Sequence, residues 1–141
     1  MGMFNLQAAI YTNDAREETL TNELTDNSMD LRLKQQHSSN DVQAIRDKYA
    51  PEKDRINNEI QDLDKTEQRE EYQDLMTELK ELKDQEEREV EKVENETNDY
   101  ETVIQTENES LEVQIEEISA STETFKEMLK QNVESEFGYF Q

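Results

Sequence analysis

The chain has 141 residues, of which 31% are apolar and 37% are charged, and its net charge is −22. This apolar share is below the roughly 45–50% of globular domains, so the composition favours long helices that each bury a narrow stripe over a compact globule. The net charge argues against nucleic acid and anionic membranes as partners, and a solvated acidic face explains it more simply than a dedicated basic partner. The absence of cysteine excludes disulfides, thiol catalysis and thiolate metal sites.

The first predicted element is an N-terminal helix over residues 1–50. Its apolar residues keep the three-, four- and seven-residue spacing of a helix face; they are Leu20, Leu24, Leu31, Val42, Ile45 and Tyr49. Ala50-Pro51 is the first predicted break, because proline disfavours the helical conformation of the preceding residue and is accepted at the start of a new helix. We therefore expect one helix to end near Tyr49 and another to begin near Pro51.

The second predicted element covers residues 51–141, as one long helix or a helix pair that ends in an aromatic C-terminus. Polar residues at 64–71 and 95–99 each offer capping-box spacing, and those at 95–99 are mediocre helix formers, so the chain reverses at one of these places or continues through both. Neither stretch holds glycine or proline, and we favour a continuous helix. A reversal at 95–99 would instead give three helices of similar length and an antiparallel bundle. Gly138 predicts the helix stop.

An apolar seam runs along the second element at steps of three and four residues or multiples of them. Its members are Tyr72, Leu75, Leu79, Leu82, Val90, Val93, Tyr100, Ile104, Leu111, Ile115, Ile118, Phe125, Leu129 and Val133. Such a seam is typical of a long amphipathic helix that packs lengthwise against other helices. The predicted fold class is all-α, an elongated coiled coil or a helical hairpin or bundle of long helices, in a single structural unit. We expect the apolar residues of the first helix, and other copies, to cover this seam.

Polar residues also occupy the seam, where Glu86, Thr97 and Asn108 follow one another at intervals of eleven. Buried polar groups on a seam set register and partner number at a cost in stability, but we prefer the simpler interpretation that these positions are exposed.

Basic residues are unevenly distributed: residues 93–125 contain none, whereas residues 46–92 hold ten of the fifteen. The acidic stretch is therefore either a solvated face or part of a charge code, in which it packs antiparallel against the more basic middle.

Apolar side chains gather at both ends of the chain. They are Phe4, Leu6, Ile10 and Tyr11 near the N-terminus, and Phe137, Tyr139 and Phe140 near the C-terminus. Exposed aromatic side chains are unfavourable in a free monomer and useful in an assembly. We expect these termini to form the joints between subunits, with ordinary end packing in a hairpin as the alternative.

The sequence holds no candidate catalytic, cofactor-binding or metal-binding residue. His37 is the single histidine and lies in a polar patch, and the many carboxylates lie on solvated helices without the burial that acid–base catalysis needs. No apolar run approaches the roughly 18–20 residues of a membrane-spanning helix, and the first residues lack a Sec-type leader. We expect a non-enzyme without cofactor that does not insert into membranes, either cytoplasmic or exported by a leaderless route.

These features favour a structural coiled-coil subunit that self-assembles as a component of a filament, appendage or scaffold. Its partners would be copies of itself or other helical proteins. One alternative is a coiled-coil binding module, such as a stalk or a holdase-type chaperone in a larger machine. The other is an acidic, partly disordered chain that folds on a basic partner.

Overall fold

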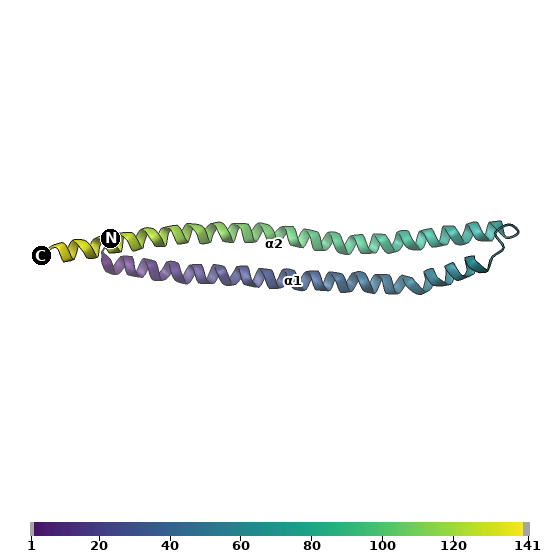
Figure 1. Ribbon diagram of the computed structural model, residues 1–141, viewed down its shortest axis with the longest axis horizontal. Helices are drawn as coiled ribbons and strands as arrows, with labels where there is room; N and C mark the ends of the chain where they lie inside the picture. The colour runs from purple at the N-terminus through teal and green to yellow at the C-terminus, as the bar shows by residue number, and fades with distance from the viewer. Residues whose placement is uncertain (1, 140–141) are drawn as a thin grey trace. The chain divides into compact units, whose positions relative to one another are not determined.

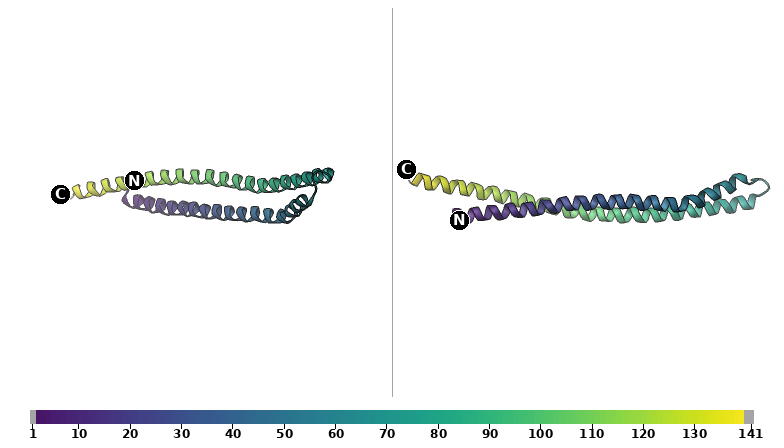
Figure 2. Two further views of the ribbon diagram at one scale, coloured as in Figure 1. Left: turned by 45° about the vertical axis from the view of Figure 1, so that its right-hand side comes forward. Right: turned by 90° about the horizontal axis from the view of Figure 1, so that it is seen from below.

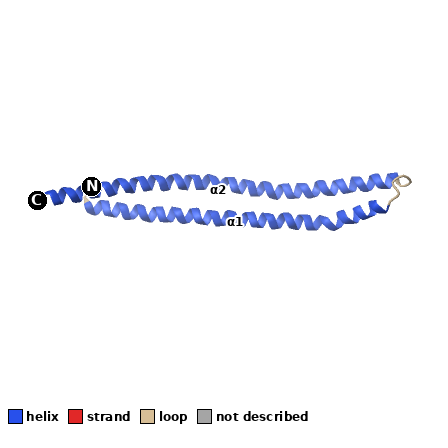
Figure 3. Cartoon of the chain, in the orientation of Figure 1, coloured by secondary structure: helices blue, strands red, loops and turns tan. Residues whose placement is uncertain are grey.

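The computed structural model describes the backbone of residues 2–139 and the side chains up to Glu136. Helix α1 spans Met3–Asp62 and helix α2 spans Arg69–Tyr139, joined by a turn at residues 63–68 (Figures 1 and 3). The described residues include no strand. The two helices pack against each other as a helical hairpin, which confirms the predicted fold class.

Pro51 lies inside α1, so the helix boundary expected at residues 50 and 51 is wrong. Proline removes one backbone N–H and with it one helical hydrogen bond, which weakens the helix at this point. Tyr49 and Ile56, on either side of the proline, are both buried, and this packing supports the helix through the defect. The blue-to-teal part of α1 bends (Figure 1).

The chain reverses at residues 63–68, where we expected a continuous helix. The side-chain oxygen Oδ1 of Asp64 accepts hydrogen bonds from the backbone N–H groups of Thr66 (3.0 Å) and Glu67 (3.3 Å). In return, Gln68 Oε1 accepts the backbone N–H of Asp64 at 3.1 Å. This exchange resembles a capping box, but the returning side chain comes from Gln68 and not from the predicted Glu67. The turn therefore satisfies several of its backbone donors without glycine or proline.

Residues 95–99 are helical within α2, as we expected. The inward positions continue through them without a change of phase, because Val93 and Tyr100 are half-buried and Thr97 is buried. At the other end, α2 continues through Gly138 to Tyr139 and so passes the expected stop.

The hairpin divides into two units, each of which contains part of both helices. Unit 1 comprises Met1–Leu31 and Thr102–Gln141, and unit 2 comprises Arg32–Glu101. In unit 1, Asn27 Nδ2 donates to Asn108 Oδ1 at 2.9 Å. In unit 2, the Lys34 ammonium lies 5.9 Å from the centre of the Tyr100 ring. Within each unit the helices therefore run antiparallel and side by side (Figures 1 and 2), and opposite residues have numbers that add up to about 135.

Candidate functional site

The packing of α1 on α2 occupies most of the predicted seam. Its buried members are Tyr49, Leu79, Val90, Ile104, Leu111 and Ile118. Its half-buried members are Leu20, Leu24, Leu31, Val42, Ile45, Tyr72, Leu75, Leu82, Val93, Tyr100, Ile115, Phe125 and Leu129, and Val133 is 36% exposed. Half-burial is what a two-helix interface produces, because each apolar stripe touches one neighbour and stays open along its sides. The seam is thus used largely within the chain.

Paired polar side chains interrupt the interface of unit 1. Besides the Asn27–Asn108 hydrogen bond, Asn13 Nδ2 donates to Ser121 Oγ at 3.4 Å. Asn108 is half-buried, so the interpretation that it is exposed is wrong. A half-buried amide pair of this kind favours one register over others, since a shifted register would leave each amide without its partner.

Glu86 is the most enclosed charged residue of unit 2, with 2% of its surface exposed, which contradicts the interpretation that it is a wet position. Lys53 Nζ lies 2.5 Å from its Oε2 atom, and Arg46 Nη1 lies 3.0 Å from its Oε1 atom. The hydrogen bond from Lys53 is the main cause that lowers the pKa of Glu86; Arg46 adds to it, and burial acts against both. The ionised carboxylate therefore links two cations of α1 to α2. Thr97, the third polar seam residue, is also buried, and its hydroxyl donates to the carbonyl of Val93.

Further polar contacts surround Glu86 at the surface of unit 2. Arg46 also binds Glu87 at 3.2 Å, and the hydrogen bonds to Glu87 and Glu86 raise the pKa of Arg46. Tyr49 donates its hydroxyl to Glu89 at 3.0 Å; burial, and then this hydrogen bond, raise the pKa of Tyr49. These groups bind one another along and between the two helices of unit 2.

The ion pairs between the helices join basic and acidic residues that all lie within residues 46–92, the more basic middle of the chain. Among the described residues, the inter-helix ion pairs lie in unit 2 and use Arg46, Lys48, Lys53 and Arg55. The register places the acidic residues 93–125 opposite about 10–42 of α1, not opposite residues 46–92. The charge-code interpretation is therefore wrong in its choice of partner, and the acidic stretch forms a solvated face.

The predicted terminal contacts divide into an inner and an outer group. Leu6 is completely buried and Ile10 is half-buried, whereas Phe4 and Tyr11 are 82% and 78% exposed. The side chains of Phe137 and Tyr139, and all of Phe140, lie outside the part of the chain that the structure describes.

Phe4 and Tyr11 belong to an apolar surface on the outer side of α1. They are seven residues apart and so share one side of the helix, together with the exposed Ala8 and Ala15. These four residues form the N-terminal face. No charged residue occurs before Asp14, although 37% of the chain is charged. The N-terminal face is therefore an uncharged, uncovered surface on an otherwise highly charged molecule.

A second uncovered surface lies on α2 in unit 1. The register places Met3 opposite residue 132, whereas α2 continues to Tyr139, and Figure 1 shows its yellow end extending past the purple start of α1. An open groove of about 500 Å³ lies at the level of the start of α1 and just beyond it, lined by Lys126, Leu129, Lys130, Val133 and Glu134. We refer to it as the C-terminal groove. It joins two apolar side chains to a rim that carries both signs of charge.

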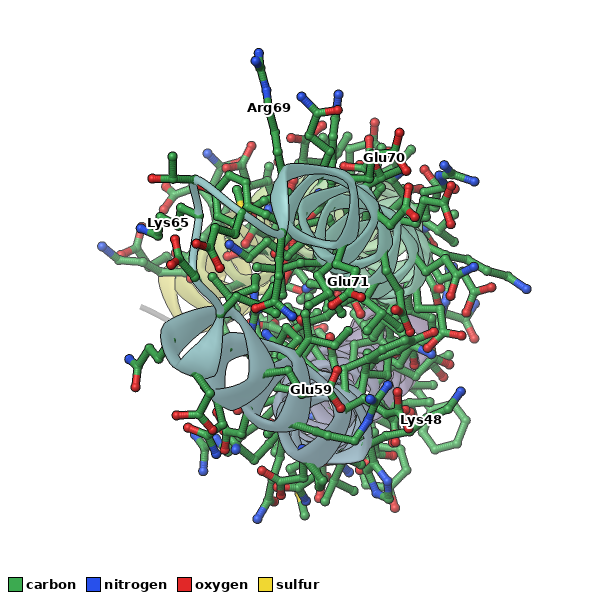
Figure 4. The ribbon with its side chains drawn as sticks, turned by 90° about the vertical axis from the view of Figure 1, so that its right-hand side faces the viewer. Lys48, Glu59, Lys65, Arg69, Glu70 and Glu71 are labelled. Atoms are coloured by element: carbon green, nitrogen blue, oxygen red, sulfur yellow. The ribbon has the colours of Figure 1, made fainter. Side chains whose placement is uncertain are left out.

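The turn in unit 2 carries charged side chains, in contrast to these two apolar surfaces. Figure 4 looks onto it and shows Arg69 extending away from the ribbon, with Lys65, Glu70 and Glu71 around the same turn.

His37 is exposed, and no group of three or more His, Asp or Glu among the described residues could hold a metal ion. Within the residues that the structure describes, neither helix has a stretch long and apolar enough to cross a membrane.

No family model, curated protein or solved structure matches this chain. The fold defines its structural class, an antiparallel helical hairpin.

Sequence reasoning missed several residues of the interface. Ile56, which the predicted seam does not include, is completely buried, and its spacing of seven residues from Tyr49 and four from Ile60 indicates the same helix face. Lys53 and Arg46 gave no signal as partners of Glu86, because the residue that faces Glu86 depends on where the chain reverses.

Proposed function

We propose that this chain is a non-enzymatic structural subunit that assembles with copies of itself through the surfaces of unit 1. The observation that carries the proposal is the exposure of Phe4 and Tyr11 on a helix side opposite to the buried Leu6. Covering a large apolar side chain contributes about 1.5–3 kcal/mol, so two aromatic rings buried against another copy supply a substantial part of a contact energy.

The charge of the chain restricts where copies can meet. Two molecules of net charge −22 repel each other, and a contact is least opposed where neither surface is charged. The N-terminal face meets this condition, because its first charged neighbour is Asp14. Added salt screens the remaining repulsion, so association should strengthen as the ionic strength rises.

The experiment measures mass against concentration by sedimentation velocity and size-exclusion chromatography with light scattering, at low and high salt. Electron microscopy of the concentrated sample then shows the form of the assembly. The variant Phe4→Ser/Tyr11→Ser should weaken association about tenfold or more. The control Val103→Ser/Val113→Ser removes apolar side chains that are 63% and 53% exposed on α2 and should leave it unchanged. A monomer at every concentration and salt level, or an equal loss in both variants, would reject the proposal.

The same exposed rings suit a second function, a binding module that holds an apolar segment of another protein. A chain that remains monomeric but suppresses the aggregation of an unfolded client, and loses this activity with Phe4→Ser/Tyr11→Ser, would support it. The third candidate, an acidic chain that folds on a basic partner, requires a circular dichroism spectrum without helix for the isolated protein.

A further inference from the structure

We propose that the C-terminal groove is a second self-contact, in which two copies pack their α2 helices antiparallel across a two-fold axis near Lys130. This inference rests on the self-assembly proposed above and adds which residues meet, and with what symmetry. The occupant of the groove is thus the same groove of a second copy.

No residue of α1 lines the groove. The lining residues all belong to α2, and α1 begins at Met3, opposite residue 132. Leu129 is half-buried and Val133 is 36% exposed, so both retain apolar surface that a further helix can cover. Val133 and Glu134 lie beyond the start of α1, whereas Lys126, Leu129 and Lys130 lie at the level of residues 5–9 of α1.

The charges on the rim select a second copy in preference to other helices. Lys126 and Lys130 are the only basic residues from Thr102 onward, and Glu134 and Glu136 follow them. A purely acidic partner would pair with the lysines but would repel Glu134. A second copy of the groove supplies both signs of charge and is complementary to itself.

The same charges select the direction of packing. Parallel copies would place Lys126 beside its own equivalent and Glu134 beside Glu134, which is repulsive. With antiparallel helices and an axis near Lys130, Lys126 comes within reach of Glu134 and Glu136 of the partner subunit. Leu129 then lies opposite Val133 of the partner subunit. A two-fold axis forms each of these contacts twice, and it leaves one like-charge contact, between the two Lys130 residues at the axis.

The two proposed contacts together give an assembly that can grow. A two-fold contact closes on itself and yields only a dimer. A second, separate contact through the N-terminal face would link such dimers into larger particles. The two surfaces can therefore be tested independently, because loss of each should stop assembly at a different size.

The test reverses charges in the full chain and measures the dimer dissociation constant by sedimentation at about 50 mM salt, where screening is weak. Lys126→Glu/Lys130→Glu should raise this constant about tenfold or more, and so should Glu134→Lys/Glu136→Lys. The chain that carries all four substitutions should dimerise again, because the complementary pairs are restored with opposite sign. Arg88→Glu/Lys92→Glu is the matched control for the lysine pair, since it lowers the net charge by the same amount at exposed positions of α2 in unit 2.

Engineered cysteines test the orientation, because the natural chain has none. Lys130→Cys lies near the proposed axis and should form a disulfide with itself. Lys126→Cys should not, since the two copies of this residue would be about 12 Å apart along the helices, farther than a disulfide spans. Cross-linking of both variants would show parallel packing and overturn the proposal.

The outcomes separate this proposal from the previous one. If Phe4→Ser/Tyr11→Ser stops growth at a dimer that the charge reversals then dissociate, both contacts hold. If the charge reversals change nothing while Phe4→Ser/Tyr11→Ser abolishes association, the groove proposal fails and the self-assembly proposal stands. If the unchanged chain stays monomeric, both fail. Failure of the four-substitution chain to dimerise, with each pair disruptive, would assign the groove to another protein.

Discussion

The substitution Lys53→Met would remove one of the two cations that hold the carboxylate of Glu86. The side chain of Glu86 is 3% exposed, and its two oxygens have different partners, Lys53 and Arg46. Without Lys53, the Oε2 atom keeps its charge where water has little access. Removing one partner of a buried ion pair costs about 3–5 kcal/mol. Because Arg46 remains and the Lys53 side chain is itself 25% exposed, we expect the free energy of unfolding to fall by about 2 kcal/mol.

The double variant Lys53→Met/Glu86→Met tests whether this loss comes from the charge left behind. Replacing both members of a buried polar pair by apolar side chains of similar size is often neutral or stabilising. The double variant should therefore be within about 1 kcal/mol of the wild type, and the two substitutions should be strongly non-additive. The assay is urea unfolding followed by far-UV circular dichroism, at a protein concentration low enough to exclude association.

The pH dependence of this stabilisation has a defined sign. Hydrogen bonds from Lys53 and Arg46 lower the pKa of Glu86 in the folded chain. The stability that ionised Glu86 contributes is therefore present above the pKa of the unfolded chain, about 4.3, and is lost as the pH falls through the pKa of the folded chain. Protonation of the other carboxylates relieves repulsion and acts in the opposite direction. The stability difference between the wild type and Glu86→Gln isolates the one group, and it should shrink below about pH 4.

An unchanged urea midpoint in Lys53→Met would refute the reasoning, because a carboxylate that tolerates the loss of a partner is not enclosed. The same holds for a double variant as unstable as Lys53→Met alone, since the uncompensated charge would then not be the cause.

Three further substitutions test the interface and the turn. Asn108→Leu leaves the Asn27 amide without its partner and should lower the free energy of unfolding, measured in urea, by about 1 kcal/mol. Asn27→Leu/Asn108→Leu should recover the lost stability and broaden the range of oligomers seen in light scattering. An unchanged range of oligomers would contradict a role of the amide pair in register. Asp64→Ala removes the acceptor of two backbone N–H groups and should cost about 1 kcal/mol in thermal unfolding, whereas Asp64→Asn keeps most of the stability; equal losses would count against the cap. Pro51→Ala restores a helical N–H donor and should stabilise the chain by about 1–3 kcal/mol, and a lower melting temperature would show that the bend is needed for packing.

The local pattern of the chain determined that it is helical and which residues face inward. Steps of three and four residues place the seam on one side of a helix whatever lies opposite, because this periodicity depends only on helix geometry. The same reasoning predicted the unbroken helix through 95–99. It failed at Pro51, because a single lost hydrogen bond weighs less than the burial of Tyr49 and Ile56 around it.

The tertiary structure alone decided where the chain reverses and which residues therefore meet. Capping patterns of similar quality occur at Asp64 and at Asn98, and neither selects the turn by itself. A reversal at 63–68 places a helix of 60 residues beside one of 71 residues. The apolar stripe of α1 can then pack against α2 in both units. That choice sets Asn27 opposite Asn108 and encloses Glu86 between two cations. Such pairs form only when two segments are brought together, so the sequence of either segment alone does not predict them.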